Sequence, residues 1–173
     1  MRSLILAVAC ALSVCALAAC GGGGGGGGHH PAVQSIRGSG FVFRAPGSWL
    51  VKRRGNQVSA LPKPTSTELV SVSVFPLLRP YKPSLFAAVT KELDSEAKQL
   101  AKQQGGAVTS SATAVVGGIR SHQYELGYTS GGQDVHERIT FALRGKTEFE
   151  LLCRWTGSEP SACSQLETSF RPT

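Results

Sequence analysis

Residues 124–139 read YELGYTSGGQDVHERI, with Gly131 and Gly132 at the centre of the stretch. Two adjacent glycines suit the positive φ angles of a two-residue hairpin turn. A turn here places Glu125 opposite Arg138, which makes a cross-strand pair of opposite charge. A register shifted by one residue would place Tyr124 opposite Arg138 instead and remove this agreement. The stretch therefore predicts two antiparallel strands with a defined pairing.

A second hairpin is expected to turn at residues 144–146, as an odd-length loop of three residues. Such a loop keeps one apolar set on a single face, namely Ile139, Phe141, Leu143, Phe149, Leu151 and Cys153. The opposite face would carry Arg138, Thr140, Glu148, Glu150 and Arg154. Glu148 and Glu150 could bind a cation, but a hard cation takes more oxygen ligands than this pair offers. A solvated face is the preferred interpretation.

The rest of the chain supplies further strands and two helices. Short strands are expected at 41–43, 57–61 and 69–75, with prolines between them that stop helices from growing. A long helix is expected over 84–104, because apolar residues recur there every three or four positions. A short helix is expected over 159–168. Together they predict the α+β class, an antiparallel β-sheet meander packed by one long and one short helix.

The first nineteen residues have the features of a secretory signal peptide, 1–19. A short basic start precedes sixteen uncharged residues, fewer than the roughly 20 that a membrane-spanning helix needs. A core helix and an uncleaved anchor are the alternatives. Residues 17–20, Leu-Ala-Ala-Cys, resemble the lipobox of bacterial lipoproteins. The resemblance implies that Cys20 is acylated, becomes the new N-terminus and anchors the chain to a membrane.

The segment 20–39 is expected to be a flexible tether, since eight consecutive glycines follow Cys20. His29 and His30 come next and are interpreted as linker residues, because structural zinc takes four ligands. A single globular α+β domain is then expected over 40–173.

Two cysteines of the expected domain, Cys153 and Cys163, are ten positions apart. In an oxidising compartment they are a natural structural disulfide. A redox pair usually has the CxxC spacing, and a zinc site would require two more ligands, so both are weaker alternatives. Pairing these two leaves Cys20 single, as an acylated cysteine should be.

No residue cluster specifies a reaction, a cofactor or a metal. His122 and His136 fall on opposite faces of the predicted hairpin, and neither stands in a nucleophile motif. Glu137 falls on the apolar face beside Leu126, where burial could raise its pKa. One alternative function is therefore an envelope hydrolase with a cleft that uses Glu137 or His122. A filled core at these positions would count against it.

The net charge is +7, and the basic residues gather in the first half of the mature sequence. From residue 20 to 82 there are eight Lys or Arg and one acid, and from residue 83 onward nine and ten. Lys52, Arg53 and Arg54 form the densest cluster, a possible basic patch. Such a patch could rest on anionic lipid headgroups or bind an acidic envelope polymer. Nucleic acid is disfavoured, because no known nucleic-acid module is present and export is expected.

Residues 43–49, FRAPGSW, resemble the Phe/Tyr-x-x-Pro-x-x-Trp opening of PsbP-like domains, and residues 149–172 resemble their closing strand and helix. The resemblance implies an αβα sandwich around an antiparallel sheet. Members of that family and its relatives act in photosystem assembly or bind a small GTPase, and no binding residue carries over to this chain.

We therefore expect a lipid-anchored protein of the bacterial cell envelope, on the periplasmic or extracellular side. It would be a non-enzymatic binding or assembly module without a cofactor. Its expected partners are the membrane, through the anchor, and an anionic envelope polymer or an envelope protein. A basic membrane-surface adaptor is the other alternative function.

Overall fold

The computed structural model describes residues 32–173. The expected signal peptide, Cys20, His29 and His30 lie outside the described residues. Within the described part, no helix combines the length and the hydropathy that crossing a bilayer requires.

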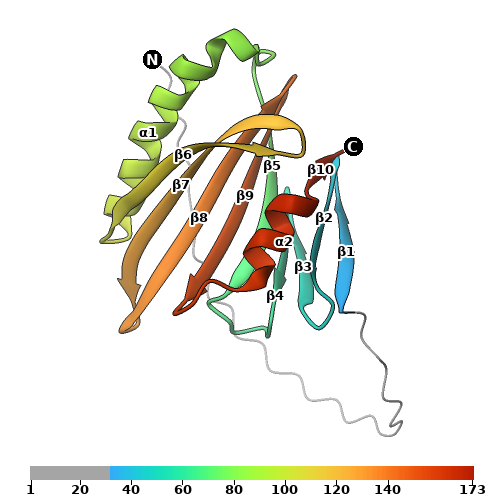
Figure 1. Ribbon diagram of the computed structural model, residues 1–173, viewed down its shortest axis with the longest axis vertical. Coiled ribbons are helices and arrows are strands. Elements are labelled where there is room, and N and C mark those ends of the chain that lie inside the picture. Colours follow the sequence, from blue (N-terminus) through green and yellow to red (C-terminus); the bar gives the residue numbers. More distant parts are fainter. Residues whose placement is uncertain (1–31) are drawn as a thin grey trace, which may run out of the picture.

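Seven antiparallel strands form the main sheet, in the order β3-β4-β5-β9-β8-β7-β6. Their bounds are β3 Leu50–Arg54, β4 Gln57–Leu61, β5 Leu69–Pro76, β6 Ala107–Val116, β7 Ile119–Ser130, β8 Gln133–Arg144 and β9 Thr147–Thr156. A small sheet of order β1-β2-β10 comprises β1 Val33–Gly38, β2 Phe41–Pro46 and β10 Arg171–Pro172. The main sheet thus joins two meanders through the β5·β9 pair, and the chain crosses between them through a helix (Figure 1).

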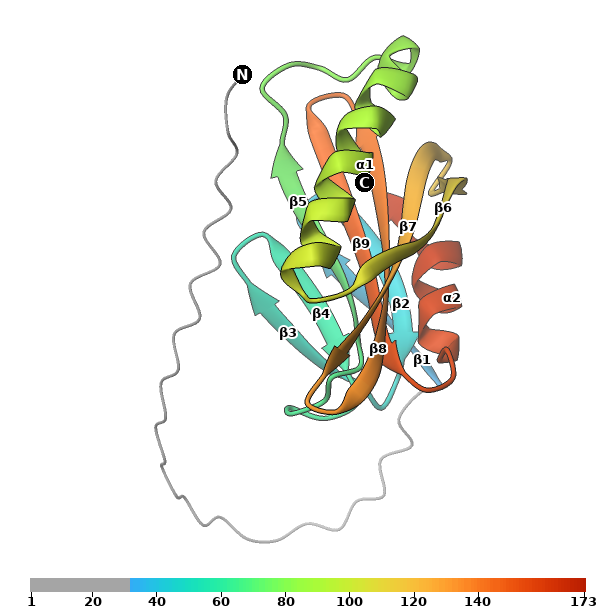
Figure 2. The ribbon, with the colours of Figure 1, turned by 90° about the vertical axis from the view of Figure 1, so that its left-hand side faces the viewer.

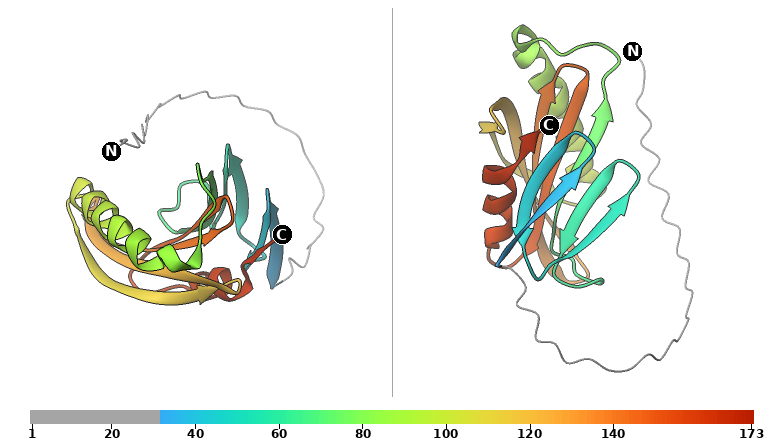
Figure 3. Two further views of the ribbon diagram at one scale, coloured as in Figure 1. Left: turned by 90° about the horizontal axis from the view of Figure 1, so that it is seen from above. Right: turned by 90° about the vertical axis from the view of Figure 1, so that its right-hand side faces the viewer.

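The two helices cover opposite faces of the main sheet (Figures 1 and 2). Helix α1 (Phe86–Gln103), preceded by the 3-10 turn η1 (Pro83–Leu85), packs on β6 and β7 and shares a core with Ile139 of β8. Its buried residues Leu93, Ala97 and Ala101 contact Tyr124, Leu126 and Ile139 in one core. Helix α2 (Ser161–Ser169) and the small sheet form the second, larger core on the other face (Figure 3). The α+β class with one long and one short helix is confirmed.

The first hairpin has the predicted register. Tyr124 pairs with Ile139 and Glu125 pairs with Arg138, around Gly131 and Gly132, whose φ angles are 60° and 77°. The guanidinium of Arg138 lies 2.6 Å from the Glu125 carboxylate and also 2.6 Å from that of Glu159.

The second hairpin differs from the prediction. Arg144 pairs with Thr147, so the turn contains two residues, Gly145 and Lys146, instead of three. Gly145 has a φ of 58° at the first central position, which is the preference of a type II′ turn. The shorter turn shifts the pairing of β9 with β8 by one residue, so each β9 side chain lies on the face opposite to the predicted one.

The consequence is that Glu148 and Glu150 lie on the α1 face, opposite Leu143 and Phe141 of β8, instead of on a solvated face. Phe149, Leu151 and Cys153 enter the other core. Both faces of this sheet are covered, so either set of β9 side chains had a core to enter and the apolar pattern alone did not fix the register.

Two boundaries also change. Strand β1 occupies 33–38, inside the segment expected to be tether, so the folded part begins before residue 40. Ile36 of this strand is buried, which explains why the strand pairs with β2. Helix α1 begins at Phe86, two residues after the expected start at residue 84, and its N-terminus has no side-chain cap.

Candidate functional site

Three connections that are distant in sequence meet at one end of the main sheet. They are the β5–α1 loop (77–85), the β6–β7 turn (117–118) and the β8–β9 turn (145–146), which we call the basic end. The strand pairing brings them together, because Pro76 at the end of β5 pairs with Thr147 at the start of β9. The loop is also fixed to the turn, since the amides of Leu77 and Tyr81 donate to the carbonyls of Lys146 and Gly145 at 2.8 and 2.7 Å.

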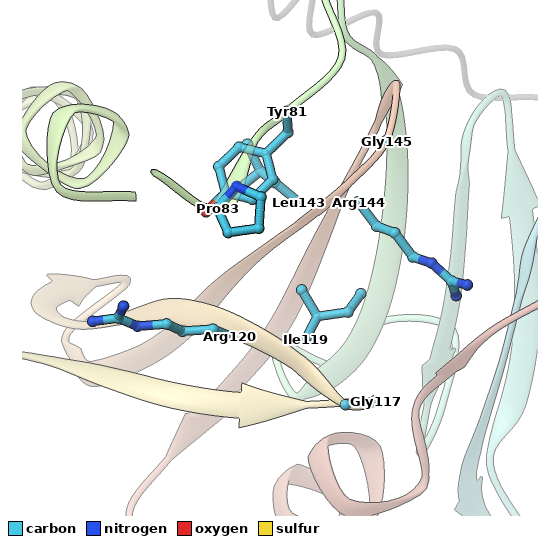
Figure 4. A pocket seen from close by; sticks show the side chains of 9 residues that line it. Tyr81, Pro83, Gly117, Ile119, Arg120, Leu143, Arg144 and Gly145 are labelled. Carbon is cyan, nitrogen blue, oxygen red and sulfur yellow. The ribbon is translucent and has the colours of Figure 1, made fainter. Parts of the chain in front are cut away.

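A cavity of about 540 Å³ opens between these connections. It is lined by Tyr81, Pro83, Gly117, Gly118, Ile119, Arg120, Leu143, Arg144 and Gly145. Tyr81 and Pro83 lie across from Ile119, while the guanidinium groups of Arg120 and Arg144 extend in opposite directions (Figure 4). The lining therefore combines apolar side chains with one cation on each side.

The β6–β7 turn that borders the cavity requires glycine. Gly117 has a φ of 60°, and a Cβ there would lie 2.9 Å from both the Phe170 ring and Pro172. The turn is thus held close against the C-terminal segment, which places Ile119 and Arg120 at the cavity.

The basic end carries five cationic side chains: Arg79, Lys82, Arg120, Arg144 and Lys146. The segments 77–85, 117–120 and 143–147 contain no acidic residue. Among residues 32–173, none of the five forms an ion pair. Arg120 lies 4.0 Å above the Phe86 ring, a cation–π contact that orients it without neutralising its charge.

The other end of the sheet has the opposite balance. Its connections carry the acids Glu68, Asp134 and Glu159, and the cation Lys63. This difference between the two ends of the sheet is distinct from the charge asymmetry along the sequence, since Arg120, Arg144 and Lys146 come from the second half of the chain.

The predicted cluster Lys52, Arg53 and Arg54 lies on the edge strand β3, where all three residues are exposed. Successive side chains of a strand point to opposite faces, so the three do not share one surface. The Lys52 ammonium donates to the Pro64 carbonyl at 3.1 Å, and the Arg53 guanidinium donates to the Arg37 carbonyl at 2.6 Å. The cations of the basic end are brought together by the fold, and no local sequence run marks them.

Glu137 is 2% exposed and forms an ion pair with Arg154, whose side chain is 31% exposed. Its Oε1 is 2.5 Å from Nε of Arg154, and it accepts a hydrogen bond from the Tyr128 hydroxyl at 2.8 Å. Burial and this hydrogen bond raise the pKa of Tyr128 to about 12. Glu137 lines neither the basic-end cavity nor the cavity of about 510 Å³ at the other end.

His122 is buried under helix α1. Its Nε2 lies 3.9 Å from Oδ1 of Asp94, which itself accepts a hydrogen bond from the Tyr124 hydroxyl at 2.7 Å. Among the described residues, neither ring nitrogen of His122 has a hydrogen-bond partner. His136 lies on the opposite face of the hairpin, as expected, and stacks on Trp155 at 5.5 Å.

Cys153 and Cys163 form a disulfide in the structure, with a Cα–Cα distance of 5.4 Å. The bond joins β9 to α2 within the larger core, where both cysteines are buried. The expected pairing is confirmed.

Glu150 is the acid most affected by its position on the α1 face. It lies between Ser73 of β5 and Phe141 of β8 on the central strand β9. Burial, followed by the charges of Glu148 and Glu137, raises the pKa of Glu150 to about 7. Burial and Glu96 also raise the pKa of Glu148. Sequence analysis missed this group because it assigned both glutamates to a solvated face.

We expect Glu150→Gln to stabilise the protein above pH 7. The folded pKa exceeds that of an unfolded glutamate, so the wild type loses stability as pH rises from about 4.5 to 7. A shift from 4.5 to about 7 corresponds to about 3 kcal/mol, which partial solvent access of the side chain reduces to about 1–2 kcal/mol. Urea unfolding at pH 4.5 and pH 8 measures the gain, which should be near zero at the lower pH. Glu92→Gln on the exposed side of α1 is the control, and a gain that does not depend on pH would contradict the expectation.

No family model matches this chain, and no curated protein matches it. Solved structures match its fold. Cyanobacterial PsbP (CyanoP) from Synechocystis sp. PCC 6803 has a TM-score of 0.62 at 13% identity and covers 87% of this chain and 98% of its own. A crystal structure from Bacteroides thetaiotaomicron VPI-5482 has a TM-score of 0.56 at 11% identity and covers 83% of this chain. The match spans only 49% of the Bacteroides chain.

LpqN of Mycobacterium tuberculosis, described as involved in cell envelope biogenesis, has a TM-score of 0.47 at 11% identity and covers 83% of this chain and 92% of its own. Identities this low are informative about architecture alone. The chain has the α+β fold of the cyanobacterial PsbP structure, as the resemblance at 43–49 and 149–172 implied.

Proposed function

We propose that this protein is a non-enzymatic binding module of the bacterial cell envelope that takes up an anionic group at its basic end. The observation that carries the proposal is the cavity at this end, bordered by Arg120 and Arg144 and accompanied by three more cations that form no ion pair within residues 32–173. A site with this charge attracts anions, and guanidinium groups match the geometry of phosphate and carboxylate oxygens.

The composition of the cavity favours binding over catalysis. Its lining contains no Asp, Glu, His, Ser or Cys, the usual sources of a general base or a nucleophile. Tyr81, Ile119 and Leu143 offer an apolar surface on which the uncharged body of a ligand can lie. Glu137 and His122, the residues of the hydrolase alternative, do not line this cavity, and Glu137 forms an ion pair with Arg154.

Export and lipid anchoring are part of the proposal. The disulfide supports an oxidising compartment, and the lipobox-like residues 17–20 support acylation of Cys20. Two or three acyl chains would hold the domain firmly at a bilayer. Mass spectrometry of the N-terminal peptide tests the anchor, and an unmodified chain that begins elsewhere than at Cys20 would refute it.

We expect glycerol phosphate to bind at the basic end. In an NMR titration of the chain without residues 1–19, carrying Cys20→Ser, the amides of Gly117, Gly118 and Gly145 should shift most. Replacing both Arg144 and Lys146 by alanine should weaken binding about tenfold, since each exposed charge contributes roughly 0.5–1 kcal/mol. The control variant Lys63→Ala removes a cation from the other end and should leave binding unchanged. Equal shifts with uncharged glycerol would contradict the proposal.

A further inference from the structure

The β5–α1 loop exposes apolar side chains among the cations of the basic end. Leu78 is 91% exposed and Leu85 is 47% exposed, and both belong to this loop. Val115, which is 73% exposed, lies at the same end of the sheet, two residues before the β6–β7 turn. A single exposed leucine is ordinary on a protein surface, but these three side chains lie at the end of the sheet where five cations gather, and Leu78 is the most exposed of the large apolar residues that the structure describes.

The loop presents Leu78 in a defined way. Three prolines, Pro76, Pro80 and Pro83, restrict its backbone, and the two hydrogen bonds to the β8–β9 turn attach it to the sheet. Leu78 is the residue after Leu77, whose amide makes one of these hydrogen bonds. The Leu78 side chain nevertheless packs into neither core. An ordered loop that holds an apolar side chain in solvent is suited to insert that side chain into an apolar environment outside the protein.

We propose that the basic end docks on the surface of a bilayer that contains anionic lipids. Leu78 enters the interface, and Arg79, Lys82 and the three other cations contact lipid phosphates around it. Apolar side chains surrounded by Lys and Arg are what binds proteins to the interface of an anionic membrane. This inference rests on the proposed function, since the cavity beside Arg120 and Arg144 would receive one headgroup.

A bilayer explains more of this surface than a soluble polymer does. Both would satisfy the cations, but a soluble anionic polymer offers no apolar phase for Leu78, Leu85 and Val115. The absence of acids in the three segments also suits a surface that approaches many negative charges at once.

The length of the N-terminal segment permits this orientation. Strand β1 begins at Val33, at the end of the domain away from the basic end (Figure 1). Twelve residues lie between Cys20 and Val33, and the thirteen residue steps from one to the other span at most about 45 Å. The longest strands have twelve residues, or about 40 Å. A chain anchored at Cys20 can therefore turn its basic end toward the same membrane.

Vesicle co-sedimentation of the chain without residues 1–19, carrying Cys20→Ser, tests the inference. We expect binding to vesicles of phosphatidylcholine with 30% phosphatidylglycerol, at least tenfold weaker binding to phosphatidylcholine alone, and weaker binding at high salt. Leu78→Gln should weaken binding to the anionic vesicles about fivefold. Leu50→Gln is the matched control, since Leu50 is 44% exposed but starts β3 at the other end. Leu78→Gln should retain the wild-type unfolding temperature, because the side chain lies in solvent.

The possible results separate the two proposals. If glycerol phosphate binds at the basic end but anionic vesicles do not, or if Leu78→Gln binds vesicles as tightly as the wild type, the docking inference is overturned and the binding module stands. If neither the soluble anion nor the vesicles bind, both proposals fail. A loss of vesicle binding in Leu78→Gln, with glycerol phosphate binding unchanged, supports membrane docking.

Discussion

Replacing Arg154 by alanine is expected to lower the free energy of unfolding by about 3 kcal/mol at pH 7. Arg154 is the cationic partner of Glu137, whose side chain is 2% exposed between helix α1 and the sheet. Removing the guanidinium leaves the Glu137 carboxylate without its cationic partner, with the Tyr128 hydroxyl as its other donor among the described residues. The cost arises from the charge left unpaired, and is larger than the net worth of the pair itself. Urea unfolding of the variant and the wild type measures the difference.

Two further variants separate this cause from simple loss of packing. Adding Glu137→Gln to Arg154→Ala should recover most of the lost stability, because the neutral amide removes the unpaired charge. Arg144→Ala, which removes an unpaired arginine at the end of β8, should cost under about 0.5 kcal/mol. A deficit in Arg154→Ala that persists after Glu137→Gln would show that lost packing explains the effect.

This ion pair also bears on the choice between a binding module and a hydrolase. A general base must have a free lone pair within reach of the proton that it removes. Glu137 directs its Oε1 to Arg154 and Tyr128, and it pairs with Leu126 on β7, four positions along that strand from His122. The two residues of the hydrolase alternative therefore occupy separate positions on the α1 face, each with neighbours of its own.

The comparison of the two hairpins shows how far the sequence determines this fold. In the first, a two-glycine turn and the Glu125–Arg138 pair both require the same register, so it could be predicted. In the second, Gly145 alone marks the turn, and the alternation on β9 fits either face, since each face packs against a helix. The predicted three-residue turn therefore assigned every β9 side chain to the wrong face of the sheet. It placed Glu150 on a solvated face, although this residue lies on the α1 face.

The candidate site was less predictable than the fold for a related reason. Its cations come from three segments, near residues 80, 120 and 145, that only the order of strands brings together. Local charge density instead selected Lys52, Arg53 and Arg54, which alternate across an edge strand. The absence of acids in each of the three segments was visible in the sequence, but it becomes a signal only when the segments are known to be neighbours.

Replacing both Cys153 and Cys163 by alanine is expected to lower the free energy of unfolding by about 3 kcal/mol. Closing a loop over a separation of ten residues removes conformational freedom from the unfolded chain by about this amount. For a domain of this size the unfolding temperature should fall by about 10 °C. Helix α2 should suffer most, since its nine residues are too few to be stable alone and the bond attaches them to β9.

Reduction provides the control for this prediction. Dithiothreitol should lower the unfolding temperature of the wild type to near that of the double alanine variant, and should leave the variant unchanged. A wild type whose unfolding temperature is insensitive to the reductant, with both thiols reactive in the folded state, would contradict the prediction. The expected result links stability to location, because a reducing cytosol removes the bond and an oxidising envelope restores it. The chain would then reach its full stability only in the compartment where an acylated Cys20 would hold it.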